Sequence, residues 1–162
     1  MFYTDYNSQF GRLLLASDGK NLTGLWFEGQ KYYADTLSNT AIKKDDLPIF
    51  AQVKNWLNAY FAGEHITITN IPLMPQGSNF RQKVWKILCD IPYGEVITYG
   101  DIAKRIGGRM SAQAVGGAVS HNPISIIIPC HRVIGAKGKL TGYAAGISTK
   151  EKLLKLEGII AQ

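Results

Sequence analysis

Apolar positions in the first half of the chain follow a strand pattern and then a helix pattern. Short apolar runs at residues 12–16 and 24–27 predict two strands, and the Asp18-Gly19 pair between them favours a hairpin turn. From Leu47 to Phe61 the apolar residues recur every three or four positions, which predicts an amphipathic helix. These elements predict a small α/β unit, and no group of residues in it suggests chemistry.

The segment Ile71–Gly77 separates this unit from the rest of the chain. Its sequence, IPLMPQG, holds two prolines and a glycine, which suit neither a helix nor a strand and are typical of a linker. The 162 residues suffice for one domain or two small ones. We therefore predict two domains, one over residues 1–73 and one over residues 74–162.

The second half of the chain is patterned for three short helices. Ser78 or Asn79 can cap the first, Thr98 can cap the second, and the third spans about residues 111–120. A tight turn at Gly107-Gly108 joins the last two, which is the pattern of a helix-turn-helix. The expected fold is an α/β N-terminal domain followed by a mainly α C-terminal domain with a winged helix-turn-helix-like DNA-binding element.

The third of these helices, the expected recognition helix, has an unusually smooth surface. Residues 111–118 read SAQAVGGA, and alanine and glycine present almost no side-chain bulk. Major-groove readers normally project several long polar side chains, whereas a smooth helix suits close backbone approach, as in a narrow minor groove. Alternatively, Gly116 and Gly117 merely allow the helix to pack closely against its own core.

Charge is divided unevenly between the two halves. Residues 1–73 carry six Lys and Arg against seven Asp and Glu, a net charge of −1. Residues 74–162 carry twelve against five, a net charge of +7. Such an asymmetry favours a polyanionic partner for the second half, although a solvated basic face without a partner would look the same.

Composition and cysteine usage exclude several classes of protein. The content of 46% hydrophobic and 19% charged residues is ordinary for a globular protein, and no run is long enough to span a bilayer. Residues 1–5 lack the layout of a secretory signal, so we expect a cytoplasmic protein whose Cys89 and Cys130 are reduced thiols. Cys89 is expected on a helix and buried. The scattered histidines show no metal-ligand spacing, so we expect no metal site.

The tetrapeptide Pro129-Cys130-His131-Arg132 carries the clearest chemical signal. It follows Ile126-Ile127-Ile128, which predicts a short buried strand, and proline then forces a turn. The two basic neighbours are expected to lower the pKa of the Cys130 thiol and favour the nucleophilic thiolate. Cysteine is also among the most buried residue types, so an inert core thiol is the alternative.

The segment NPISIIIPCHRVIG, residues 122–135, resembles the active-site signature of the O6-alkylguanine-DNA alkyltransferases. The similarity continues upstream through residues 92–96 and Tyr99, and downstream through residues 141–143 and 150–158. This resemblance implies a ribonuclease H-like N-terminal domain and direct DNA repair. The alkyl group on O6 of a flipped-out guanine would pass to Cys130, and each molecule would act once.

The resemblance also assigns catalytic roles. His131 matches the histidine that accepts the cysteine proton through a water, Glu157 matches the carboxylate that orients it, and Asn122 matches the asparagine that ties the local turn. Without the resemblance, Glu157 would be read as a surface carboxylate at a helix end, where Ser148-x-x-Glu151 predicts a capping box and Gly158 the C-terminal stop. We interpret Arg132 as a structural ion-pair partner rather than a phosphate contact.

Further positions would contact the substrate and the DNA. Tyr99 matches the tyrosine that contacts the base and crowds the 3′ phosphate. Tyr143 would form an aromatic wall of the guanine pocket, with the backbone groups of Val133 and Ala144 at the base edge. The expected DNA-binding residues are Tyr99, Arg81, Ser111, Ala112 and Gln113. The partner implied is double-stranded DNA containing O6-alkylguanine, bound by a monomer that needs no cofactor and no membrane.

This chain departs from the pattern of that family in three places. Gln113 stands where an arginine usually fills the gap left by the flipped base, so we expect weaker flipping or altered damage preference. Lys152 replaces a common tryptophan, which would change helix packing or add charge near DNA. Ala144-Ala145 replaces residues that are often smaller or hydroxylated, which could restrict bulky adducts.

Other functions fit the sequence less well. An alkyltransferase-like protein that binds the lesion without transfer would lack the cysteine, and Cys130 is present; Gln113 keeps this sensor role as the alternative. A transcription regulator would need a less smooth recognition helix. A cysteine hydrolase would need an oxyanion hole and an acyl substrate, which the sequence does not indicate.

Overall fold

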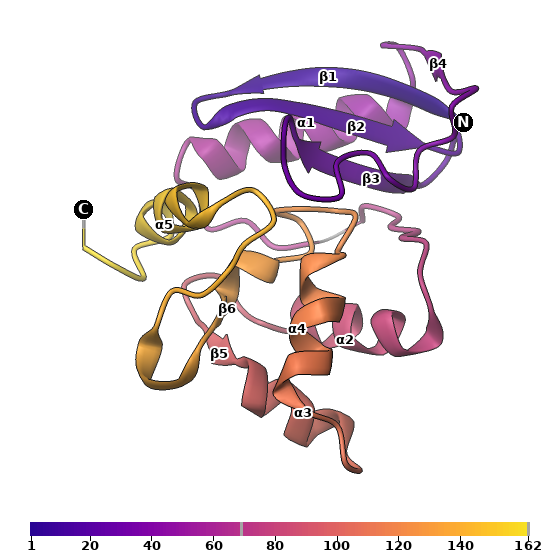
Figure 1. Cartoon of the computed structure of the whole chain (residues 1–162). Helices are drawn as coiled ribbons and strands as arrows, with labels where there is room; N and C mark the ends of the chain where they lie inside the picture. Colours follow the sequence, from indigo (N-terminus) through magenta and orange to yellow (C-terminus); the bar gives the residue numbers. More distant parts are fainter. Residues whose placement is uncertain (69, 162) are drawn as a thin grey trace.

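The computed structural model describes residues 1–68 and 70–161 and has a sheet part above a helical part (Figure 1). The sheet contains β1 (Phe2–Ser8), β2 (Gly11–Ser17), β3 (Leu22–Phe27) and β4 (Ile42–Lys43), in the order β3-β2-β1-β4. β1, β2 and β3 form an antiparallel meander, and β4 runs parallel to β1. Helix α1 (Pro48–Phe61) packs against this sheet.

The predicted elements of the first half are confirmed, and one strand is additional. β2 and β3 cover the two predicted strands, and α1 follows the predicted helix. The Asp18 carboxylate accepts the backbone N–H groups of Lys20 and Asn21, which closes the predicted hairpin turn. β1 was not predicted because its sequence, FYTDYNS, is largely polar and only Thr4 in it is buried.

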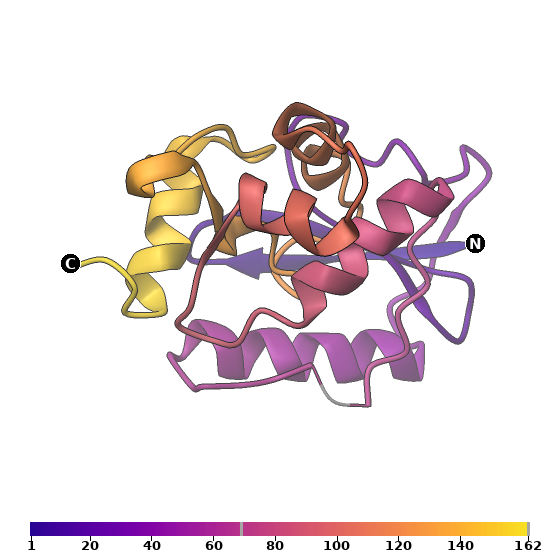
Figure 2. The same ribbon diagram turned by 90° about the horizontal axis from the view of Figure 1, so that it is seen from below.

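The helical part contains α2 (Asn79–Cys89), α3 (Tyr99–Ile106), α4 (Ala112–Ser120) and α5 (Ile147–Leu156). In Figure 2, α2, α3 and α4 lie across the near side, α1 runs along one side, and α5 lies at the end away from the N-terminus. Thr98 and Asp101 form a reciprocal capping box on α3, and Ser78 and Ser111 cap α2 and α4. The helix-turn-helix prediction for α3 and α4 is therefore confirmed.

Short elements complete the C-terminal part beside these helices. β5 (Ile97–Thr98) pairs in parallel with β6 (Val133–Ile134), and this pair is the nearest counterpart of the expected wing. Two short 3₁₀ turns, η1 (Cys130–Arg132) and η2 (Ala136–Gly138), flank β6.

Three local predictions are wrong. Residues 126–128 are buried but form turns rather than a strand, because backbone groups bond locally and Ile126 has a φ of +70°. No capping box forms at Ser148, because the N-cap of α5 is Gly146, two residues before the predicted cap. Cys89, the last residue of α2, is exposed rather than buried. Partial burial of its sulfur still raises the thiol pKa to about 11.

The two parts share one continuous apolar core rather than two separate ones. The free edge of β3 bonds to segments of the helical part. The Leu25 N–H donates to the Pro123 carbonyl and the Ser125 N–H donates to the Leu25 carbonyl, both at 2.8 Å. Leu22 makes the same pair of 2.8 Å bonds with Pro72 and Met74. β3 thus fixes the position of the segment that leads into Cys130.

Candidate active site

The turn that carries Cys130 is held by the side chain of Asn122. Its Nδ2 donates to the carbonyls of Ile124 and Ile128 at 3.2 and 2.8 Å, and its Oδ1 accepts the Ile124 N–H at 3.0 Å. These bonds hold Ile126 in the left-handed region, which costs a β-branched residue about 1–3 kcal/mol. Cys130 follows this turn and is 4% exposed.

Next to Cys130 in the sequence, His131 begins a buried network of hydrogen-bonded polar side chains. His131 is fully buried, and its Nε2 lies 2.5 Å from Oε2 of Glu157 at the end of α5. Oε1 of Glu157 accepts the Nε–H of Arg132 at 2.8 Å and the Gly94 N–H at 3.2 Å. Arg132 also donates to the Ile91 carbonyl at 2.7 Å, so it is a structural ion-pair partner. Reading Glu157 as a surface carboxylate is wrong, because this residue is buried.

The end of α5 places Glu157 accurately. Glu157 is the C-cap, and the following Gly158 has a φ of +75°. The Gly158 N–H donates to Lys155 and the Ile159 N–H donates to Leu154, which are the two bonds of a Schellman motif. The glycine stop that the sequence predicts is therefore confirmed, and it turns the last carboxylate of the helix inward.

The groups around His131 determine which of its two ring nitrogens can accept a proton. Burial raises the Glu157 pKa, but the hydrogen bonds and charges of His131 and Arg132 outweigh it and bring that pKa to about 2. Burial lowers the His131 pKa and favours the neutral ring. A neutral ring that donates from Nε2–H to Glu157 has Nδ1 as its acceptor. Nδ1 is buried without a hydrogen-bond partner among the described residues.

The thiol itself does not behave as the sequence predicts. Burial raises the Cys130 pKa, and the neighbouring Asn122, Lys150 and Tyr143 only partly oppose this. The expected lowering by adjacent positive charge is wrong, because Arg132 is paired with Glu157 and the His131 ring is neutral. The resting group is therefore a protonated thiol, which needs a base to become a nucleophile.

A cavity of about 590 Å³ opens beside this site, on the α4 side. Its lining combines α3, α4, the segment after η2 and the loop after β3: Lys31, Tyr99, Ala112, Gln113, Gly116, Ser120, Thr141, Gly142, Tyr143 and Ala144. Tyr143 lines the cavity, and its hydroxyl is buried. Burial, and after it the neighbouring Cys130, raises the pKa of that hydroxyl. Tyr143 thus lies between the cavity and the thiol.

Most of the expected contact residues meet at this cavity, and three do not. Tyr99, Ala112, Gln113, Tyr143 and Ala144 line it. Val133 is fully buried away from it, and its carbonyl accepts Lys150 Nζ. Ser111 caps α4 through the Ala114 N–H without lining the cavity. Arg81 lies on α2, outside the cavity.

The smooth face of α4 is turned toward this cavity rather than toward the core. Val115, Ala118 and Val119 provide the buried face of the helix. A Cβ added at Gly117 would meet nothing within 4 Å, and one at Gly116 would only touch the Tyr99 ring at 3.9 Å. Close packing against the core therefore does not explain the two glycines.

Sequence comparison connects both parts of the chain to one family. Residues 79–159 match the 6-O-methylguanine DNA methyltransferase DNA binding domain, and residues 1–75 match the ribonuclease-like domain of the same protein. This chain belongs to the 6-O-methylguanine DNA methyltransferase family. Its fold is the two-domain fold of that family, as the sequence predicts.

Individual relatives support this assignment over nearly the whole chain. A methylated-DNA–protein-cysteine methyltransferase of Haemophilus influenzae is 46% identical over 98% of this chain and 87% of its own length. That of Methanosarcina mazei is 49% identical over 97% of both chains. The crystal structure of Mycobacterium tuberculosis OGT in complex with DNA has a TM-score of 0.86 and 47% identity, covering 97% of this chain and 92% of that one.

Sequence reasoning missed two residues of this methyltransferase site. Tyr60 of α1 is fully buried, and its hydroxyl donates to Oε2 of Glu157 at 2.7 Å, so the N-terminal part does contribute to the site. Lys150 is fully buried, and its Nζ donates to the carbonyls of Val133 and Thr141 at 2.5 and 3.0 Å. Burial brings the Lys150 pKa to about 8.

A signal for both residues was present in the helical spacing. Tyr60 lies three positions after Leu57 on the apolar face of α1, and Lys150 lies three and four positions before the buried Leu153 and Leu154. The lysine-rich sequence of α5 nevertheless looks like an exposed face. Lys152, which departs from the family pattern, is indeed exposed, and it lies near Phe10 rather than at the α4 cavity.

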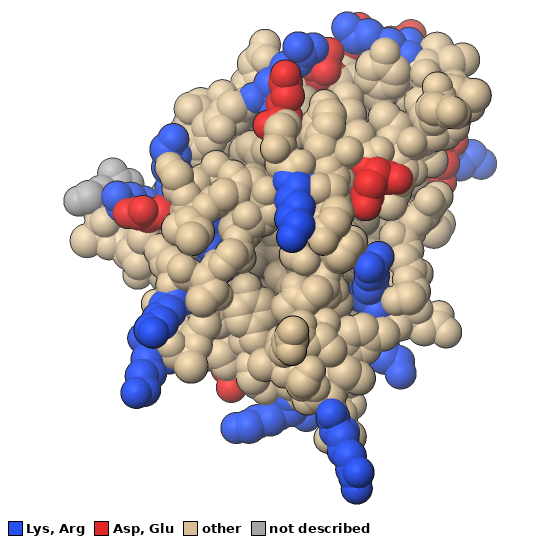
Figure 3. Space-filling view, in the orientation of Figure 1, with Lys and Arg blue, Asp and Glu red and all other residues tan. Residues whose placement is uncertain are grey.

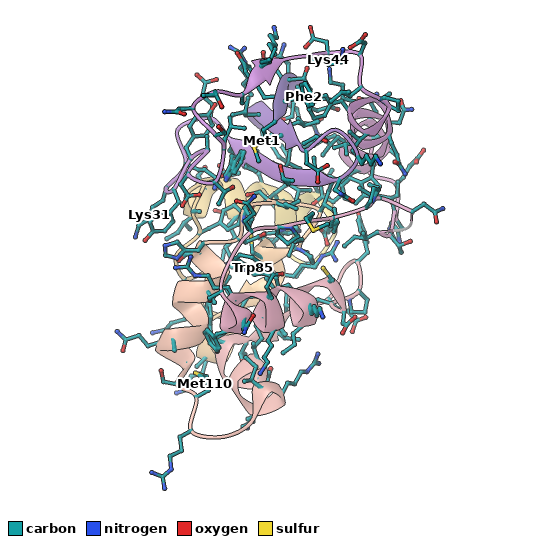
Figure 4. All side chains as sticks on the ribbon, turned by 90° about the vertical axis from the view of Figure 1, so that its right-hand side faces the viewer. Met1, Phe2, Lys31, Lys44, Trp85 and Met110 are labelled. Carbon is teal, nitrogen blue, oxygen red and sulfur yellow. The ribbon has the colours of Figure 1, made fainter. Side chains whose placement is uncertain are left out.

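Lys31 brings a positive charge from the sheet part to the cavity. Its backbone N–H donates to the Ala144 carbonyl at 2.9 Å, which ties the loop after β3 to the cavity rim. Figure 4 shows the Lys31 side chain projecting outward at the boundary between the two parts of the molecule. On the face shown in Figure 3, Lys and Arg predominate over the helical part, while both signs of charge mix over the sheet.

Proposed function

We propose that this chain repairs DNA by moving the alkyl group of an O6-alkylguanine onto Cys130, once per molecule. One observation supports this most directly: a buried cysteine adjoins a neutral histidine whose other nitrogen is held by an ionised carboxylate. In that arrangement the carboxylate fixes the imidazole in one tautomer, so that Nδ1 can act as the base that deprotonates the thiol.

The chemistry follows from these groups. His131 Nδ1 takes the proton of the Cys130 thiol through a water, and Glu157 stabilises the imidazolium that forms. The thiolate attacks the alkyl carbon, a carbon–sulfur bond forms, and the carbon–O6 bond breaks with its electron pair on guanine. Guanine takes up a proton and is restored. The thioether has no route back to the thiol, so the reaction ends there.

The α3–α4 pair is the proposed DNA-binding element. The extruded guanine would enter the cavity between Tyr99 and Tyr143, because a base stacked in a duplex cannot reach a buried thiol. Ala112 and Gln113 at the start of α4 would then lie at the opening that the base leaves. The smooth surface of α4 permits close backbone approach to the DNA at that point.

The remaining expectations are part of the same proposal. The protein would act as a cytoplasmic monomer on duplex DNA, without a cofactor, with its two domains meeting at residues 73 and 74. In the described part of the chain no helix is long and apolar enough to cross a membrane. Within residues 1–68 and 70–161, no group of three His, Cys, Asp or Glu side chains could hold a metal ion.

Peptide mass mapping tests the transfer directly. The protein is incubated with a duplex containing one O6-methylguanine, and the peptides that carry Cys130 and Cys89 are compared. One added methyl on Cys130, absent from Cys130→Ser and retained in Cys89→Ser, is the expected result. Bound DNA with an unmodified Cys130 would instead favour the alternative function, a lesion sensor that transfers nothing.

The cavity rim suggests a limit on adduct size. Ala144 lines the cavity, and we expect its methyl group to leave less room for a bulky O6 substituent than glycine would. Methyl adducts should therefore be removed faster than benzyl adducts, and Ala144→Gly should reduce the difference. Equal rates for the two adducts in the unmodified chain would refute this limit.

A further inference from the structure

Tyr60 approaches the candidate active site from the sheet part of the molecule. Its ring stacks on Trp56 of the same helix at 5.3 Å between centroids, and meets the Tyr93 and His131 rings edge to face at 6.4 and 6.5 Å. These aromatic neighbours leave the side chain little freedom. The hydroxyl therefore has a fixed position, 2.7 Å from Oε2 of Glu157.

The Tyr60 hydroxyl shares one carboxylate oxygen with His131. Oε2 of Glu157 receives both the Tyr60 hydroxyl and the His131 Nε2, while Oε1 receives Arg132 and Gly94. The hydroxyl also lies 3.5 Å from Nε2 itself. A donor on Oε2 draws negative charge away from the imidazole, and this weakens the tendency of the carboxylate to keep a second proton on the ring.

We infer that Tyr60 is a positioning residue of the transfer reaction: its hydroxyl holds Oε2 of Glu157 against His131 and keeps the resting imidazole neutral. The inference rests on the proposed function of Cys130. It gives the sheet domain a direct part in the chemistry, because the proton acceptor on one domain is adjusted by a hydroxyl of the other.

The other groups around His131 do not replace this hydroxyl. Glu157 and Lys150 of α5 and Arg132 of η1 are the charged groups that act on the ring, and Tyr93 faces the Arg132 guanidinium at 5.6 Å. Arg132 neutralises the far oxygen, Oε1. Lys150 is occupied by two backbone carbonyls. Apart from His131 itself, Tyr60 is the only described residue that donates to Oε2, the oxygen that faces the imidazole.

Tyr60→Phe tests the inference, because it removes the hydroxyl and keeps the ring. Without this donor the His131 imidazolium is stabilised, so the neutral base appears only at higher pH. The acidic limb of the transfer rate should move up by about one pH unit, which is about a tenfold slower rate on that limb. Tyr6→Phe is the matched control, since Tyr6 donates at the same 2.7 Å to Asn58, away from the site.

Two further measurements separate this role from a merely structural one. NMR titration of the His131 ring, without DNA, should show its midpoint rising in Tyr60→Phe and unchanged in Tyr6→Phe. In a Glu157→Gln background, Tyr60→Phe should no longer shift the midpoint, because the hydroxyl acts through the carboxylate. The comparison in the Glu157→Gln background also separates this role from a general loss of stability in Tyr60→Phe, because such a loss would not depend on the carboxylate.

The outcomes distinguish the inference from the proposed function. An unmodified chain that transfers no methyl group contradicts the proposed function, and the NMR midpoint still tests Tyr60. A chain that transfers normally, with the same pH profile and the same His131 midpoint in Tyr60→Phe as in Tyr6→Phe, overturns the inference alone.

Discussion

Four donors converge on the carboxylate of Glu157: Tyr60, His131, Arg132 and the Gly94 N–H. A buried carboxylate without such donors would take up a proton. Here the donors keep it ionised, and the charge in turn fixes the tautomer of His131. At the scale of single residues, the candidate site therefore depends on Glu157 as much as on the thiol.

Replacing Glu157 by glutamine should lower both stability and transfer. Arg132 would lose its buried partner, which costs about 3–5 kcal/mol of unfolding free energy. Transfer to Cys130 should slow by about 100-fold, because the imidazolium loses its counter-charge. Urea unfolding and single-turnover rates measure the two effects. Glu151→Gln removes an exposed carboxylate of the same helix and should change stability by less than about 0.5 kcal/mol.

The pH dependence of stability should report the same carboxylate. The Glu157 pKa is about 2 in the folded protein against an ordinary 4.5, so its stabilisation is fully present above about pH 4.5. It is lost as the pH falls toward 2, and it amounts to about 3 kcal/mol. Urea midpoints should therefore separate the unmodified chain from Glu157→Gln at neutral pH and converge on acidification. A constant difference between pH 3 and 7 would contradict this.

Helix α4 serves two purposes on two faces. Val115 and Val119 anchor one face in the core, while Gln113 and Gly116 line the cavity on the other. Since glycine inside a helix costs stability relative to alanine, its presence at an open position indicates a requirement other than packing.

Substituting Gly117 by alanine should separate that requirement from stability. The added methyl meets nothing within 4 Å, so the variant should be more stable by about 0.5–1 kcal/mol. Affinity for duplex DNA should fall nonetheless, because the backbone can no longer approach as closely. Gly100→Ala is the control, because it adds the same methyl group to a glycine of the neighbouring helix α3. Unchanged DNA affinity in Gly117→Ala would refute the close approach.

Restoring arginine at position 113 should strengthen action on duplex DNA. Gln113 lines the cavity without a charge, and Gln113→Arg adds a cation beside the opening left by a flipped base. Transfer from duplex DNA should become faster, and DNA affinity should depend more steeply on salt, by about 0.9 in log–log slope if one phosphate is neutralised. Gln76→Arg adds the same charge to the linker and should not accelerate transfer.

Helices and their ends could be predicted from the sequence because their signals are local. Thr98, Ser78 and Gly158 act through bonds to neighbours three or four residues away, which a sequence displays. Residues 126–128 could not be predicted, because their path depends on Asn122 and on the edge of β3. β-branched residues favour strands only when the surrounding structure offers a ladder.

Part of the candidate site could be predicted from the sequence, and here too local signals could be recognised while contacts between distant residues could not. Cys130, His131 and Glu157 lie in a motif that a resemblance can identify. Tyr60 lies 97 residues before Glu157, and no local spacing connects two residues that far apart. The raised thiol pKa depends on burial, and the sequence of a turn does not specify how deeply its side chains are buried.

At the scale of the whole molecule, the two parts form one cooperative structure. The shared core and the bonds of β3 to Pro72 and Pro123 cross the boundary between them. Residues 74–162 alone should therefore lack a fixed fold, and heat should unfold the intact chain in one transition. Calorimetry of the whole chain and near-UV circular dichroism of the fragment test this. A fragment with a sharp transition of its own would contradict it.

The edge of β3 has a consequence for the fate of damaged protein. Every residue of this strand is buried, and it is the outermost strand of its sheet. Its outer edge bonds to the segments around residues 73 and 124. If these segments detach, the edge is exposed, and an apolar strand with an exposed edge is a template for pairing between chains. Any variant that loosens the helical half should therefore aggregate and precipitate. Such a variant would be lost from the cell because it is insoluble, even where its catalytic residues are unchanged.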